Sequence, residues 1–119
     1  MQEPYILLID DNKSIRDCLI WVFDEEGYSV ITASNGKDAL ELLEKNPSLP
    51  DFILLDLMMP IMNGWQFRDQ QQLNPRFKNI LTIILSAKMN IAEQSFYPNE
   101  YLLPKPFDIE DLLVLIKKN

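Results

Sequence analysis

The chain has 119 residues, of which 47% are hydrophobic and 24% charged, and its formal net charge is −7. This length and composition are typical of one globular domain with a single core, so we expect one domain over residues 1–119. The acidic balance argues against direct binding to nucleic acid. Because the sequence has no histidine, a Ser-His-Asp triad, a histidine-based zinc site and a phosphohistidine are all excluded.

The cysteine count and the hydropathy pattern bear on location. Cys18 is the single cysteine, so no internal disulfide can form, which fits a reducing compartment. No apolar run approaches the roughly 20 residues that a membrane span needs. The first residues also lack the basic and apolar pattern of a signal peptide. We therefore expect a cytoplasmic protein that makes no membrane contact.

Short apolar runs of strand length alternate along the chain with segments of helical periodicity. The predicted strands are Tyr5–Ile9, Ser29–Ala33, Phe52–Leu55, Ile80–Leu85 and Tyr101–Leu103. The predicted helices run from about Ser14 to before Gly27, from Gly36 to Asn46, from Gly64 to about Leu73, as a short helix around Ile91–Phe96, and onward from Asp108. In the first helix Cys18 falls within the apolar spacing i, i+3, i+4, i+7, so it is predicted to be buried.

Five strands that alternate with five helices predict an α/β fold, a doubly wound parallel sheet with helices on both faces. In such sheets the functional site lies beyond the carboxyl ends of the strands. The residues to consider at the ends of the predicted strands are Asp10, Asp11, Ala33, Ser34, Asp56, Ser86 and Lys105.

Three of these strand-end residues are carboxylates. Each aspartate alone is more often a helix N-cap than a functional group. Three that converge repel one another unless a cation lies between them. Their oxygen ligands suit Mg²⁺, with Mn²⁺ also possible, and a zinc site is improbable. A carboxylate can also attack phosphorus to give an acyl phosphate, and a hydroxyl and an ammonium group nearby could contact the phosphoryl oxygens.

Several motifs together resemble the receiver domains of two-component response regulators, of the chemotaxis-regulator type. The segments YILLIDDN, ASNGKDALELL, DFILLDLMMPIMNG, LSA and KPF occur in the order in which that family has its counterparts. The resemblance covers the chain from Tyr5 to Lys118. It implies a flavodoxin-like sheet with strand order 2-1-3-4-5.

The resemblance also implies roles for individual residues. Asp56 would be the phosphoacceptor and a Mg²⁺ ligand, Asp11 a direct ligand, and Asp10 a ligand through water. Met58 would contribute its backbone carbonyl oxygen to the metal. Ser86 and Lys105 would contact the phosphoryl group, and the Lys105–Pro106 bond would be cis.

The implied function is a phosphorylation switch rather than an enzyme, with at most self-phosphorylation and autodephosphorylation. The phosphate would come from a histidine kinase or a histidine phosphotransfer protein. Output would pass to an effector protein or a fused output domain, and a homodimer is a further expected partner state.

The sequence departs from the family pattern in two places. The family's aromatic switch residue lies three positions before the lysine, where this chain has Leu102, and Tyr101 lies four before it. Either a bulge brings Tyr101 into register or the aromatic switch is missing. The segment between Ser86 and Lys105 is also shorter than usual, so the fourth helix is predicted to be short.

Three alternative functions differ in chemistry. The first is a receiver-like interaction module that works without phosphorylation. The two departures motivate it, and the intact set of strand-end residues argues against it, namely Asp10, Asp11, Asp56, Ser86 and Lys105. A Mg²⁺-dependent phosphatase with an aspartate nucleophile would need an acidic residue where Met58 stands. A flavodoxin would need a Ser/Thr/Gly-rich phosphate loop where the chain has Asp10-Asp11-Asn12.

Overall fold

The computed structural model describes residues 4–86, 100–104 and 107–118, with only the backbone described at Ser86, Pro104 and Lys118. Strands and helices alternate along most of this length, as the periodicity predicts. The elements are β1 (Tyr5–Ile9), α1 (Lys13–Glu25), β2 (Ser29–Ala33), α2 (Gly36–Lys45), β3 (Phe52–Asp56), α3 (Gly64–Leu73), β4 (Leu81–Ser86), β5 (Glu100–Pro104) and α4 (Ile109–Lys118).

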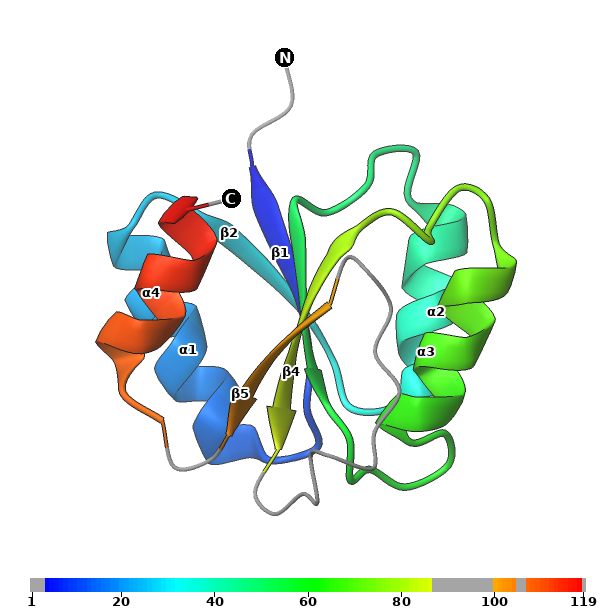
Figure 1. The fold of residues 1–119 in the computed structure, drawn as a ribbon, viewed down its shortest axis with the longest axis horizontal. Coiled ribbons are helices and arrows are strands. Elements are labelled where there is room, and N and C mark those ends of the chain that lie inside the picture. Colours follow the sequence, from blue (N-terminus) through cyan, green and yellow to red (C-terminus); the bar gives the residue numbers. More distant parts are fainter. Residues whose placement is uncertain (1–3, 87–99, 105–106, 119) are drawn as a thin grey trace.

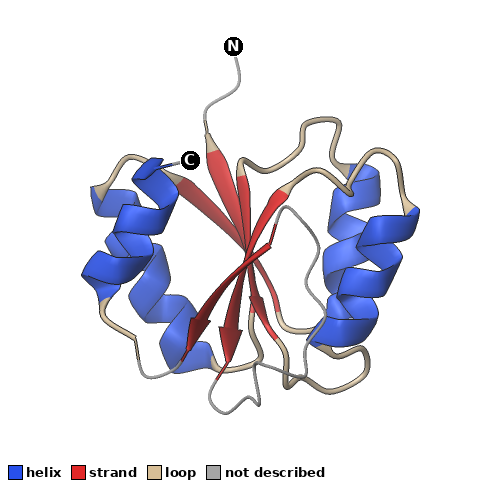
Figure 2. Ribbon diagram, viewed as in Figure 1, coloured by secondary structure: helices blue, strands red, loops and turns tan. Residues whose placement is uncertain are grey.

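The five strands form one parallel sheet in the order β2-β1-β3-β4-β5, which confirms the predicted topology. Helices α1 and α4 cover one face of the sheet, and α2 and α3 cover the other (Figures 1 and 2). Because all strands run the same way, their carboxyl ends share one edge of the sheet. Residues that follow β1, β3, β4 and β5 are therefore brought to a common edge.

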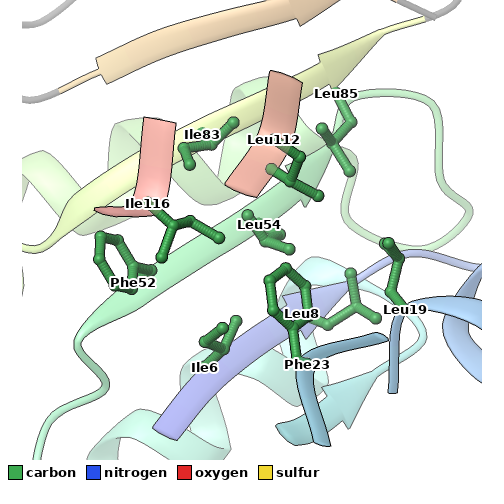
Figure 3. Packing of buried hydrophobic residues seen from close by; sticks show 10 residues of the cluster. All are labelled: Ile6, Leu8, Leu19, Phe23, Phe52, Leu54, Ile83, Leu85, Leu112 and Ile116. Atoms are coloured by element: carbon green, nitrogen blue, oxygen red, sulfur yellow. The ribbon is translucent and has the colours of Figure 1, made fainter. Parts of the chain in front are cut away.

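Two hydrophobic clusters hold the helices to the sheet, one on each face. Successive strand residues point to opposite faces, so Ile6 and Leu8 join one cluster while Leu7 and Ile9 join the other. Figure 3 shows the first cluster, in which side chains of α1 and α4 pack on the strands. The central strand β3 is buried at every residue, and this explains its unbroken apolar run.

Asparagine side chains determine where the first three helices begin. Asn12, Asn35 and Asn63 each accept a hydrogen bond from a backbone N–H in the first turn of α1, α2 and α3, respectively. Before α3 the cap is reciprocal, because the Gln66 side chain accepts from the Asn63 N–H at 3.0 Å. Each of these helices starts directly after a strand or loop at the carboxyl edge of the sheet.

Cys18 is exposed, so the prediction that it is buried was wrong. The buried residues of α1 are Leu19 and Phe23, which set the middle of its inner face. Cys18 precedes Leu19 by one residue and is rotated about 100° away from it around the helix. The i, i+3, i+4 spacing alone did not distinguish the middle of the stripe from its margin.

The pairing of β4 with β5 bears on the two departures from the family pattern. It runs without a bulge from Thr82 opposite Glu100 to Ser86 opposite Pro104, so within the described residues no bulge shifts Tyr101. Tyr101 alternates with Leu102 and lies on the same face as Leu103, which packs on the cluster beneath α1 and α4. The predicted short helix at Ile91–Phe96 lies outside the described residues, and α4 is the helix predicted after Asp108.

The amino ends of the strands form the opposite edge of the sheet. Pro4 before β1 and Lys117 in α4 line one pocket at this edge, together with Phe52 and Leu81 at the starts of β3 and β4. A separate finding concerns the helices: in the described part of the chain, none is long and apolar enough to cross a membrane.

Candidate functional site

Three carboxylates meet at the carboxyl edge of the sheet. One oxygen atom from each of Asp10, Asp11 and Asp56 lies within 4.8 Å of the other two. Asp10 and Asp56 are buried, and Asp11 is exposed. The predicted convergence of the aspartates that follow β1 and end β3 is therefore confirmed.

Asp56 is the last residue of β3 and only 6% exposed. Its backbone pairs with Leu85 in β4, so the sheet fixes the position of its main chain. The N–H of Met58 donates a long hydrogen bond of 3.4 Å to Oδ1 of Asp56. The carboxylate is thus held by the start of the loop that follows it.

Asp10 is fully buried directly after β1. Its N–H donates to the carbonyl oxygen of Ala33 at 3.1 Å, which extends the pairing of β1 with β2. Its Oδ1 accepts the N–H of Asn12 at 2.9 Å. Both contacts orient the side chain at the point where α1 begins.

Gly64 allows α3 to start against the backbone of the buried aspartate. A Cβ atom at this position would lie 2.6 Å from the Asp56 carbonyl oxygen and 2.6 Å from Cα of Leu57. The Gly64 N–H also donates to the Leu57 carbonyl oxygen at 3.0 Å. The glycine that ends the DFILLDLMMPIMNG segment is therefore required by close backbone contact, a reason that the sequence pattern did not reveal.

The loop between β3 and α3 is held at a second point by α2. The N–H of Gly36, the first residue of α2, donates to the Met62 carbonyl oxygen at 2.9 Å. Within the loop the Met62 N–H donates to the Pro60 carbonyl oxygen at 2.7 Å. This hydrogen bond closes a three-residue turn around Ile61, which has a φ of 68°.

The remaining predicted site residues are Ser86, Lys105 and Met58, and the structure describes only some of them. Ser86 ends β4 and its backbone pairs with Pro104, which places it on the same edge of the sheet as Asp56. Lys105 and the Lys105–Pro106 bond lie outside the described residues. Met58 is close to Asp56 through its backbone N–H, while its side chain is 67% exposed.

Arg16 is a residue near the site that the sequence analysis missed. Its Nη1 atom donates to the Asp10 carbonyl oxygen at 2.8 Å. An arginine on the second turn of a helix ordinarily points to solvent, so the pattern held no signal for this contact. The contact is seen only in the structure, where the Arg16 side chain reaches back to the end of β1.

The donor set of the carboxylate cluster fits a hard divalent cation. Its oxygens come from three aspartates close enough to share one ion, and magnesium prefers carboxylate and water ligands. Without a cation, three ionised carboxylates at this spacing would repel one another. The cluster can therefore hold a metal beside a buried carboxylate that is itself a potential nucleophile.

Comparison with known proteins agrees with this arrangement. The family model "Response regulator receiver domain" matches residues 6–117. The chain is 33% identical to sporulation initiation phosphotransferase F of Bacillus subtilis, over 99% of this chain and 94% of that protein. Its fold is similar to a crystal structure of the Vibrio cholerae chemotaxis protein CheY4, with a TM-score of 0.85, 28% identity and coverage of 98% of each chain.

Other relatives are longer. The chain is 33% identical to the response regulator MprA of Mycobacterium sp. (strain KMS) over 94% of this chain, and it spans about half the length of that protein, 48%. The matched family model, the strand order and the carboxylate cluster at the sheet edge all point to the same family. This chain belongs to the family of response regulator receiver domains of two-component systems.

Proposed function

We propose that residues 1–119 form a single receiver domain that is phosphorylated on Asp56 in a Mg²⁺-dependent reaction. The observation that carries the proposal is the cluster of Asp10, Asp11 and Asp56, whose oxygens lie within 4.8 Å of one another. Asp56 is the best candidate for the acceptor because it is buried at the end of the central strand and its backbone pairs with Leu85 of β4.

The metal site of this proposal uses oxygen ligands only. Asp11 and Asp56 would bind Mg²⁺ directly, Asp10 through water, and Met58 through its backbone carbonyl oxygen. Mn²⁺ could take the same place. When bound, the cation would offset the negative charge that gathers on a transferring phosphoryl group.

The proposed chemical step is nucleophilic displacement at phosphorus. A carboxylate oxygen of Asp56 forms an O–P bond while the bond from phosphorus to the donor's nitrogen or oxygen breaks, and the donor keeps the electron pair. Ser86 and Lys105 would contact the oxygens of the phosphoryl group. Ser86 has support from its backbone position at the end of β4.

The proposed partners follow from family membership. A histidine kinase or a histidine phosphotransfer protein would supply phosphate, since this chain has no histidine of its own. An effector protein, a fused output domain or a second copy of the chain would respond to it. The single cysteine fits a cytoplasmic location.

The test is the intact mass of the protein after incubation with acetyl phosphate, with and without Mg²⁺. We expect wild type to gain one phosphoryl group only when Mg²⁺ is present. Asp56→Asn should gain none. The control Asp69→Asn changes an exposed aspartate on α3 and should behave like wild type.

The main competing function is a receiver-like interaction module that works without phosphorylation. A wild-type protein that gains no phosphoryl group from either acetyl phosphate or a phosphorylated histidine protein would contradict our proposal and favour this module. An adduct that forms equally well on Asp56→Asn would instead show that the acceptor is another residue.

A further inference from the structure

Arg16 reaches from α1 back to the end of β1. The Asp10 carbonyl oxygen, which accepts its Nη1 hydrogen bond at 2.8 Å, belongs to the peptide group that joins Asp10 to Asp11. The Arg16 side chain is half-buried and lines a polar pocket of about 460 Å³ that also contains Asp38 and Glu41. The guanidinium group is thus directed at the backbone between two of the three clustered carboxylates.

The contact fixes a part of the main chain that the sheet does not. The Asp10 N–H donates to the Ala33 carbonyl oxygen, and Asp10 Oδ1 accepts the Asn12 N–H across the Asp10–Asp11 peptide group. Arg16 adds a hydrogen bond to the carbonyl oxygen of that same peptide group. Because a peptide group is planar, the direction of the Asp10 carbonyl bond determines where the N–H and Cα of Asp11 lie. Arg16 therefore helps to place Cα of Asp11, from which the Asp11 side chain extends.

Asp11 depends on its backbone for this position. Its side chain is exposed, and it makes no hydrogen bond or ion pair with any residue in the described part of the chain. A carboxylate without side-chain contacts reaches the cluster only if its Cα is correctly placed. A rotation of the Asp10–Asp11 peptide would change the position of this ligand relative to Asp56.

We propose that Arg16 is a positioning residue, one that holds Asp11 in place for a divalent cation; the inference rests on the proposed function. Two roles for Arg16 predict opposite effects of its removal on Mg²⁺ binding, and the first is simple electrostatic repulsion. A cation near a Mg²⁺ site repels the metal, so its loss should strengthen Mg²⁺ binding. Positioning requires that its loss weakens Mg²⁺ binding, so the direction of the change separates the two roles.

The test is isothermal titration of the protein with Mg²⁺. We expect Arg16→Gln to weaken Mg²⁺ binding by about tenfold, the lower end of the range for groups that orient metal ligands. Arg16→Lys should recover part of this loss, because an ammonium group can donate one hydrogen bond to the same oxygen. With acetyl phosphate, Arg16→Gln should need more Mg²⁺ but reach nearly the wild-type rate at saturation.

Arg76 offers a matched control. It also donates to backbone carbonyl oxygens, those of Leu43 at 3.1 Å and Asn46 at 2.6 Å, at the end of α2. Arg76→Gln should lower thermal stability and leave Mg²⁺ affinity unchanged. A folded Arg16→Gln that binds Mg²⁺ as tightly as wild type, or more tightly, overturns the inference, and so does an Arg16→Lys that binds Mg²⁺ more tightly than wild type. A wild-type protein that binds no Mg²⁺ overturns the metal-dependent proposed function itself.

Discussion

Arg68 on α3 lies with its Nε atom 3.4 Å from Oε1 of Glu100, the first residue of β5. The two side chains are 8% and 0% exposed. Since β5 is at the edge of the sheet and pairs only with β4, this buried ion pair ties the edge strand to a helix on the face of the sheet. Removal of one partner would leave the other charge buried.

The first prediction concerns this pair. Arg68→Met should lower the free energy of unfolding by about 3–5 kcal/mol, because the Glu100 carboxylate loses a cationic partner in a buried place. The double variant Arg68→Met/Glu100→Met should recover much of the loss. Urea denaturation of the single and double variants measures both values. A single variant within about 1 kcal/mol of wild type would contradict the prediction.

Gly64→Ala should disturb the proposed phosphoacceptor directly. Its Cβ would overlap the backbone of Asp56 and Leu57, so the main chain must shift, at a cost of about 1–3 kcal/mol. A shift of this kind should slow phosphorylation by acetyl phosphate by at least about tenfold. The measurements are urea denaturation and the rate of mass gain.

Gly27→Ala is the comparison for that variant. Gly27 has a φ of 86°, and a Cβ there would meet no atom within 4 Å. The substitution should destabilise the protein by about 1 kcal/mol through backbone strain and leave phosphorylation unchanged. Equal phosphorylation rates in the two variants would show that the contact of Gly64 with Asp56 has no functional effect.

Ile61→Gly should stabilise the protein. Ile61 is β-branched, has a φ of 68° and is 78% exposed, so its side chain strains the turn and adds little packing. Relief of the strain should raise the free energy of unfolding by about 1 kcal/mol. Met58→Gly, in the same loop but without positive φ, should not stabilise. Thermal denaturation distinguishes the two variants. Equal changes in melting temperature would show that the backbone at Ile61 is not strained.

The pH prediction concerns Tyr5. Burial raises the pKa of its phenol above the usual 10.0, and its hydroxyl donates to the Ser48 carbonyl oxygen at 2.6 Å. The folded-state pKa is above the unfolded value. The stability that the un-ionised Tyr5 phenol contributes is therefore fully present below about pH 10 and is lost as the pH rises further. The stability difference between wild type and Tyr5→Phe should therefore shrink above that pH. A difference that stays constant up to pH 12 would contradict it.

Much of the fold could be predicted because its signals are local. Continuous apolar runs indicated β1 and β3, and asparagines at helix starts accompanied the change of periodicity. The convergence of Asp10, Asp11 and Asp56 followed from parallel strands that end at one edge. Each of these inferences needs only the chain direction and the spacing of residues.

Contacts made by long side chains could not be predicted in the same way. The return of Arg16 to the Asp10 carbonyl oxygen and the pairing of Arg68 with Glu100 depend on how helices settle on the sheet. The exposure of Cys18 depends on a rotation of α1 that spacing alone leaves open. Tertiary packing decides all three.

The two described ends of the chain lie together, since Pro4 and Lys117 line one pocket at the amino edge of the sheet. Asp56 lies at the other edge, the length of a five-residue strand away, which is roughly 16 Å. A circular permutant that joins these ends with a short linker should therefore fold with its acceptor edge unobstructed. A tag, a surface tether or a fluorescent label attached at that pole would likewise leave the route to Asp56 open.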